Sequence, residues 1–192
     1  MNPRTLWQAA TAEHRSWLFL NAIVIAAVIN AALNALIAWG SAAGEENIPL
    51  LAVPFIEGPS TITDTVGTFF ILTFLTTLGI TTAVWQEVRK GKLLPLAHPI
   101  ARLPRTRLRR GAYLGAICTL VLGPPAVLVL ALLDFGDLSV GQFVLYKAIF
   151  GVVLGALVTP PIALFALADG KTGVAPAREA HPQNMGPASP DA

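Results

Sequence analysis

Charged residues are scarce in this chain. Asp, Glu, Lys and Arg make up 12% of its 192 residues, compared with about 25% in soluble domains. Hydrophobic residues make up 54%, and the mean hydropathy is +0.64. This shortage of charge excludes an ordinary soluble domain and is typical of an integral membrane protein.

Cysteine and histidine are also rare. The single cysteine, Cys118, lies inside an apolar run, which excludes an intramolecular disulfide and leaves no cysteine spacing for a metal site. The histidines, His14, His98 and His181, fall in predicted loops or tails, and the sequence has no HExxH motif, nucleophile elbow or glycine-rich phosphate loop. We therefore expect no catalytic residues, no metal, no cofactor and no enzymatic activity.

What the chain has instead is four long apolar segments. The first has 23 residues without a charge, and a helix of that length measures about 34 Å, enough to cross a hydrocarbon core of about 30 Å. The four spans are expected at residues 17–39, 62–86, 111–133 and 143–168. The predicted fold is an all-α integral membrane protein whose four transmembrane helices form a bundle.

The segments that flank the spans are polar. Residues 1–16 are expected to be a short cytoplasmic segment, and residues 17–168 the transmembrane domain. Residues 169–192 are rich in Pro, Ala and Gly and lack apolar periodicity, which predicts a disordered cytoplasmic tail.

Basic residues are concentrated between the second and third spans. Residues 87–110 hold eight of the thirteen Lys and Arg residues, whereas the loops after the first and third spans hold none. The positive-inside rule then predicts a multi-pass protein of the cell (inner) membrane with this loop and both termini in the cytoplasm. The basic residues of the loop are Arg89, Lys90, Lys92, Arg102, Arg105, Arg107, Arg109 and Arg110.

This basic loop is the predicted contact for the lipid bilayer, through anionic headgroups, or for a membrane-protein partner. It has no interleaved aromatic residues, so nucleic acid is not an expected partner. Its apolar residues are expected to lie on the membrane surface. These are Leu93, Leu94, Leu96, Ile100 and Leu103.

The second span is rich in threonine. The spacing of Thr61 and Asp64 predicts a capping box at its start. On a helical wheel, Thr65, Thr68, Thr76 and Gly79 share a side that we expect to face protein. Ile71, Phe74, Leu75 and Leu78 occupy the opposite side, which we expect to face lipid.

Two asparagines lie on one face of the first span. Asn30 and Asn34 must find hydrogen bonds in hydrocarbon, because an unpaired amide there is costly. We expect both to bond to the threonine side of the second helix, where Thr76 lies.

Lys147 is the one formal charge within the fourth span, about five residues from its outer boundary. Its closeness to the boundary favours snorkelling of the ammonium group to the headgroups. The alternative is an inward-facing lysine paired with Asp64, Asp134 or Asp137, which would mark an intramembrane polar site.

Both the third and the fourth span contain a proline pair nine residues after a glycine. Pro124 and Pro125 follow Gly115, and Pro160 and Pro161 follow Gly151. Each pair is expected to kink its helix and to free backbone carbonyls. A simple structural kink is favoured over the alternative, a transporter hinge whose carbonyls line a cavity.

Small residues form a stripe in the fourth span. Lys147, Gly151, Gly155 and Thr159 recur every four residues, and the two glycines form a GxxxG spacing that allows close helix packing. The expected partner surface is the third span, through Gly111 and Gly115.

Two functional interpretations follow. The first is an accessory or scaffold protein that binds membrane partners or anionic lipid through the basic loop. The alternative is a small, oligomeric permease or channel that uses the proline-broken third and fourth helices.

Overall fold

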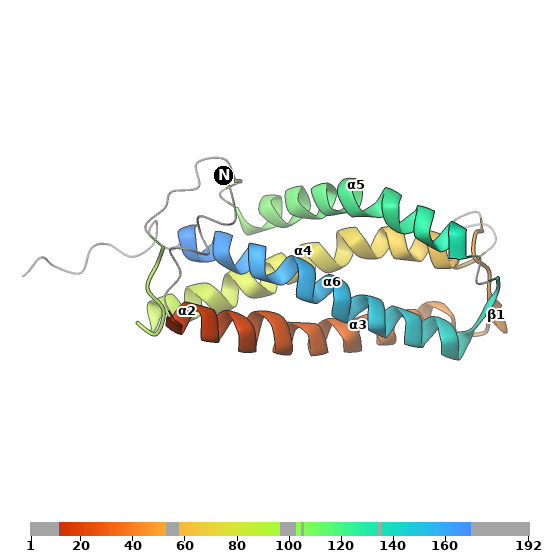
Figure 1. Ribbon diagram of the computed structural model, residues 1–192, viewed down its shortest axis with the longest axis horizontal. Coiled ribbons are helices and arrows are strands. Elements are labelled where there is room, and N and C mark those ends of the chain that lie inside the picture. Colours follow the sequence, from red (N-terminus) through yellow and green to blue (C-terminus); the bar gives the residue numbers. More distant parts are fainter. Residues whose placement is uncertain (1–11, 53–57, 97–102, 105, 134–135, 170–192) are drawn as a thin grey trace, which may run out of the picture.

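Four long helices form an antiparallel bundle in the computed structural model (Figure 1). The structure describes residues 12–52, 58–96, 103–104, 106–133 and 136–169. Each of the four helices is long and apolar enough to cross a membrane. The predicted all-α, four-helix membrane fold is therefore confirmed.

The first long helix has three parts. It begins as α2 (Ala12–Trp17), continues through a π-helical stretch, η1 (Leu18–Ile25), and ends as α3 (Ala26–Ser41). The helix thus starts before residue 17, where the sequence placed its beginning. The apolar run alone does not mark this start, because the first helical turn carries polar residues such as His14.

The other three long helices extend slightly beyond their apolar runs. They are α4 (Thr61–Arg89), α5 (Arg107–Leu133) and α6 (Val140–Asp169). Two short strands, β1 (Asn47–Ile48) and β2 (Leu138–Ser139), pair antiparallel with Asn47 opposite Ser139. They tie together the two loops at the end of the bundle that we call the strand end.

At the opposite end of the bundle, α4 finishes and α5 begins. We call it the basic end, because it carries Arg89, Lys90, Lys92, Arg107, Arg109 and Arg110. In the bundle, α4 and α6 are the central pair, α3 packs along α6, and α5 packs along α4. Helices α5 and α3 therefore lie at the two outer positions (Figure 1).

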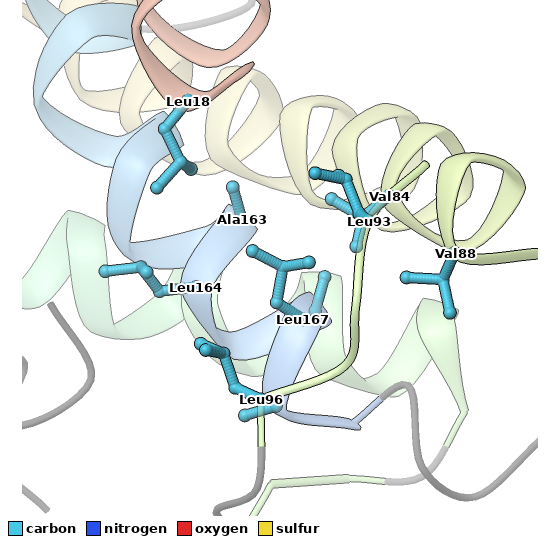
Figure 2. Close-up of a cluster of buried hydrophobic side chains, with 10 residues drawn as sticks. Leu18, Val84, Val88, Leu93, Leu96, Ala163, Leu164 and Leu167 are labelled. Carbon is cyan, nitrogen blue, oxygen red and sulfur yellow. The ribbon is translucent and has the colours of Figure 1, made fainter. Parts of the chain in front are cut away.

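Leucines from the basic loop close the basic end. Leu93 and Leu96 are buried in a cluster with side chains of α4 and α6, with Leu93 beside Val84 and Leu96 beside Leu167 (Figure 2). The backbone N–H of Leu96 also donates to the carbonyl of Leu167 at 3.1 Å. The expectation that these two leucines lie on the membrane is wrong, because burial against the helix ends removes them from that surface.

The other apolar residues of that loop differ from one another. Leu94 is exposed and Leu103 is half-buried, whereas Ile100 lies outside the described residues. The carbonyl of Leu94 accepts a hydrogen bond from Nε2 of buried His14 at 2.7 Å. The loop is therefore fastened to the first helix as well as to α6.

The strand end is closed by residues after α3. Ile48 is fully buried with Ala38 and Phe143. The carbonyls of Pro49 and Leu50 accept from the backbone N–H groups of Thr61 and Ile62 at 3.0 and 3.1 Å, so the described part of this loop folds back over the bundle.

The threonine side of α4 faces protein, as the helical wheel predicts. Thr65, Thr68 and Thr76 are buried, whereas Ile71 and Leu75 are exposed on the opposite side. Three members depart from the pattern. Gly79 is exposed, Leu78 is half-buried, and half-buried Phe74 contacts α5.

Both proline pairs lie inside continuous helices. Pro124 and Pro125 are within α5, and Pro160 and Pro161 are within α6, with helical residues on both sides of each pair. The kinks expected at these positions stay predictions.

Candidate functional site: a buried ion pair and the two helix ends

Lys147 of α6 points into the bundle and pairs with Asp64 of α4. Only 1% of the lysine side chain is exposed, compared with 22% for the aspartate. The ammonium group also donates to the hydroxyl of Thr68 and, at 3.4 Å, to the backbone carbonyl of Asp64. The snorkelling favoured from the sequence is therefore wrong. The Asp64 carboxylate, the Asp64 carbonyl and the Thr68 hydroxyl lie within reach of the ammonium group inside the bundle.

The start of α4 makes Asp64 available to this lysine. The helix begins one residue earlier than the predicted box, with Ser60 as its N-cap, and the Ser60 hydroxyl accepts from the backbone N–H of Thr63 at 3.3 Å. The capping role assigned to Thr61 and Asp64 is therefore wrong. The Asp64 carboxylate in the first turn is left to bind Lys147, where the positive end of the helix also favours its charge.

Polar and aromatic side chains surround the pair. The hydroxyls of Tyr146 and Thr65 are 2.8 Å apart, and the ring of Phe150 lies 5.6 Å from the lysine nitrogen, within the range of a cation–π contact. Phe150 in turn meets Phe69 edge to face, with ring centroids 5.1 Å apart. Sequence reasoning did not place Tyr146, Thr65, Thr68 or Phe150 at this site. The four-residue spacing of Asp64 and Thr68 is a signal that could have found Thr68.

The asparagines form a second polar contact, near the middle of the bundle. Thr76 donates to the side-chain oxygen of Asn30 at 3.4 Å, which confirms the bond expected between α3 and α4. Asn34 does not follow this expectation, because its side-chain nitrogen donates to the Asn30 carbonyl of its own helix at 2.8 Å.

The GxxxG stripe of α6 packs on these asparagines rather than on α5. A Cβ atom added to Gly151 would lie 2.7 Å from the Asn30 carbonyl oxygen, and one added to Gly155 would collide with the Asn30 amide. The predicted pairing of this stripe with Gly111 and Gly115 is wrong. The four-residue spacing of the glycines predicts a close contact between α6 and another helix, but it does not determine which helix that is.

Gly111 and Gly115 instead pack closely against two phenylalanines of α4, Phe74 and Phe70. Added Cβ atoms there would lie 2.9 Å from the Phe74 ring and 3.0 Å from the Phe70 carbonyl oxygen. The two rings lie nearly parallel, with centroids 6.2 Å apart. These glycines therefore set the spacing of α4 and α5.

Thr159 stands apart from both polar contacts. It is fully buried, and its hydroxyl donates to the Gly155 carbonyl of α6 at 2.5 Å. The sequence predicts one intramembrane polar site, formed by Lys147, Asn30, Asn34, Thr76, Thr159 and Asp64. The structure separates these residues into the Lys147–Asp64 pair, the Asn30–Thr76 bond, and Asn34 and Thr159, whose side chains bond to carbonyls of their own helices.

The basic residues of the loop fall into two groups. Arg107 donates to the Thr82 hydroxyl at 3.0 Å and stacks over the Trp85 ring, with its guanidinium carbon 4.3 Å from the centroid. Arg110 is buried and donates to the Pro104 carbonyl at 3.3 Å. The second, exposed group is Arg89, Lys90, Lys92 and Arg109. Arg102 and Arg105 lie outside the described residues.

The charges at the two ends of the bundle have opposite signs. Glu45, Glu46 and Asp137 are exposed at the strand end. Within the described ranges, no three His, Cys, Asp or Glu residues come together as metal ligands. The exposed cations of the basic end are therefore one feature that the geometry presents for binding.

No protein-family model, curated protein or solved structure matches this chain.

Proposed function

We propose that this protein is a membrane-embedded accessory protein whose basic end binds the headgroups of anionic lipids in the cytoplasmic leaflet. The observation that carries the proposal is the cluster of four exposed cations, Arg89, Lys90, Lys92 and Arg109, at one end of a membrane-spanning bundle. Each Lys or Arg near an anionic surface contributes about 1 kcal/mol. The exposed acids of the opposite end would disfavour the same lipids there.

The proposed orientation follows from the same distribution. Under the positive-inside rule the basic end faces the cytoplasm, so both chain termini lie there. A multi-pass arrangement with this orientation places the Lys147–Asp64 pair near the outer surface. The pair then serves to hold α4 and α6 together, because its charges cancel and the lysine is sealed from solvent.

The alternative of a small oligomeric permease or channel gains less support. That mechanism requires carbonyls freed by the proline pairs to line a path. In α5 the residues concerned are Leu120 and Val121, whose side chains are 75% and 62% exposed on the outside of the bundle. Exposed apolar side chains at this position suit contact with lipid or with a partner helix rather than with an ion.

Competitive lipid retention tests the proposal. The protein would be extracted into mild detergent with an equal mixture of phosphatidylglycerol and phosphatidylcholine, and the retained lipids would be counted by native mass spectrometry. The test variant replaces Arg89, Lys90, Lys92 and Arg109 by Gln. The matched control replaces Glu45 and Glu46 by Gln and Asp137 by Asn at the strand end.

We expect the wild-type protein to retain phosphatidylglycerol preferentially. The test variant should lose this preference by about fivefold or more, since neutralising one well-placed cation already removes about 1 kcal/mol. The control should keep it. Equal retention of both lipids by the wild-type protein would refute lipid binding through charge, and a stoichiometric co-purifying protein would favour a scaffold for a membrane partner.

A further inference from the structure

A groove of about 830 Å³ runs along the outside of the bundle between the first helix and α4. Both of these helices pack on α6, and the groove lies between them. Its walls include Leu20, Ile29 and Leu33 on one side and Leu75, Gly79 and Ile80 on the other. Leu20, Ile29 and Leu75 are exposed, so the groove opens toward lipid.

Polar residues line the groove at the basic end of the bundle and again near its middle. Ser16, Gln86, Glu87 and Lys92 line it at the basic end of the bundle. Asn30 and Thr76, which are hydrogen-bonded to each other, line it near the middle of the bundle. The groove thus extends from the level of the headgroups toward the centre of the membrane.

The groove is shorter than a full membrane crossing. On α4 it runs from Leu75 to Glu87 and on the first helix from Ser16 to Leu33, which correspond to about 18 Å and about 25 Å of helix. Half of a hydrocarbon core of about 30 Å is about 15 Å. A transmembrane helix of another protein would cross the whole core, whereas a lipid chain occupies a single leaflet.

The polar end also suits a phospholipid headgroup. Glu87 is within 3.0 Å of Lys90 and 3.9 Å of Lys92, so one carboxylate is shared by two ammonium groups and positive charge remains. The side chain of Lys92 is 69% exposed and belongs to the groove lining. Ser16 and Gln86 add neutral hydrogen-bonding groups beside it.

From these observations we infer that the groove holds one acyl chain of a phospholipid whose phosphate lies at Lys92. The inference rests on the proposed function for the charge of that headgroup. The exposed cations then select the headgroup, and the groove holds the chain of the same molecule. A volume of about 830 Å³ is within the range of small-molecule sites, roughly 300–1,000 Å³.

Gly79 allows the groove to be filled without disturbing the bundle. It lines the groove, and a Cβ added to it meets no atom within 4 Å. Gly79→Phe therefore places a ring in the groove. Gly67→Phe is the matched control, because Gly67 is also an exposed glycine of α4 with open space around an added Cβ, but it is not among the residues that line the groove.

The experiment uses the full chain in nanodiscs with a small fraction of phosphatidylglycerol that carries a diazirine in one acyl chain. After photolysis, labelled peptides are mapped by mass spectrometry. We expect labelling around Leu20, Ile29 and Leu75, reduced about tenfold by Gly79→Phe and unchanged by Gly67→Phe. Labelling that is the same in both variants, or spread evenly over exposed side chains of α5, would overturn the inference.

A parallel arm with diazirine-labelled phosphatidylcholine separates this inference from the proposed function. Groove labelling that is equal for the two lipids but blocked by Gly79→Phe would support the groove and refute the charge preference. If Gly79→Phe left both the phosphatidylglycerol preference and the groove labelling unchanged, the charge preference would be supported and the groove would be refuted as the site of the acyl chain. If Gly79→Phe dissociates a dimer while labelling stays the same, the groove belongs to a second copy and the inference fails.

Discussion

Lys147 and Asp64 form an asymmetric ion pair, in which the lysine side chain is 1% exposed and the aspartate side chain 22%. The lysine depends on its partner, because it lies in the interior and its other acceptors, the Thr68 hydroxyl and the Asp64 carbonyl, carry no formal charge. The aspartate is near the end of the bundle, where water and headgroups can solvate it.

This asymmetry predicts unequal effects of two substitutions. Asp64→Asn leaves a buried ammonium without a charged partner and should cost about 3–5 kcal/mol of stability. Lys147→Met leaves a partly exposed carboxylate and should cost less, about 1–3 kcal/mol. Unfolding in detergent, followed by tryptophan fluorescence, measures both.

The double variant Asp64→Asn with Lys147→Met is the control for this pair. It should be more stable than Asp64→Asn alone, because no charge remains buried. If the two single variants lost the same stability and the double variant lost their sum, the pair would not be coupled.

The close packing of α6 on α3 predicts that small additions to its glycines are harmful. Gly151→Ala and Gly155→Ala should each lower stability by about 1–3 kcal/mol, since the new methyl group meets the backbone or amide of Asn30. Gly141→Ala is the matched control on α6, because an added Cβ meets nothing within 4 Å. Thermal denaturation in detergent compares the three, and unchanged stability of Gly155→Ala would contradict the packing.

The two groups of basic residues predict different phenotypes for Arg107 and Arg109. Arg107→Gln removes the contact with Trp85 and the hydrogen bond to Thr82, so stability should fall by about 1–2 kcal/mol. Arg109 is exposed, and Arg109→Gln should change stability by less than about 0.5 kcal/mol.

Lipid retention should show the opposite order. Arg109→Gln should weaken the preference for phosphatidylglycerol, whereas Arg107→Gln should leave it nearly intact. The comparison needs both the denaturation curve and the lipid count for each variant. If Arg107→Gln removed the lipid preference and Arg109→Gln did not, headgroup binding would belong to Arg107 rather than to the exposed cations, and the prediction would be wrong.

The orientation can be tested because the chain has a single cysteine, Cys118. In a Cys118→Ala background, Glu46→Cys places a thiol at the strand end and Lys90→Cys places one at the basic end. A membrane-impermeant maleimide applied to intact cells should label Glu46→Cys at once and Lys90→Cys only after the membrane is opened. The reverse pattern would overturn the cytoplasmic assignment of the basic end.

Several properties of the bundle could be predicted from the sequence because they depend on local patterns. Four apolar segments of sufficient length must become helices in lipid, since backbone groups there need internal hydrogen bonds. The threonine side of α4 also followed from its helical period. The bond of the Asn30 side-chain oxygen to Thr76 also followed, from the cost of an unpaired amide, whereas the buried Asn30 side-chain nitrogen has no hydrogen-bond partner among the described residues.

Only the tertiary structure decided which surfaces meet. A four-residue spacing on α6 indicates close packing, but any of the three other long helices could receive it, and the Asn30 and Asn34 face of α3 does so. Whether Lys147 extends to the headgroups or points into the bundle likewise depends on whether Asp64 lies at the same depth on a neighbouring helix. The sequence by itself determined how many helices there are and which sides are polar, because those are properties of single segments. Helix partners, the lysine's direction and the groove between the first helix and α4 depend on distances between segments far apart in the chain.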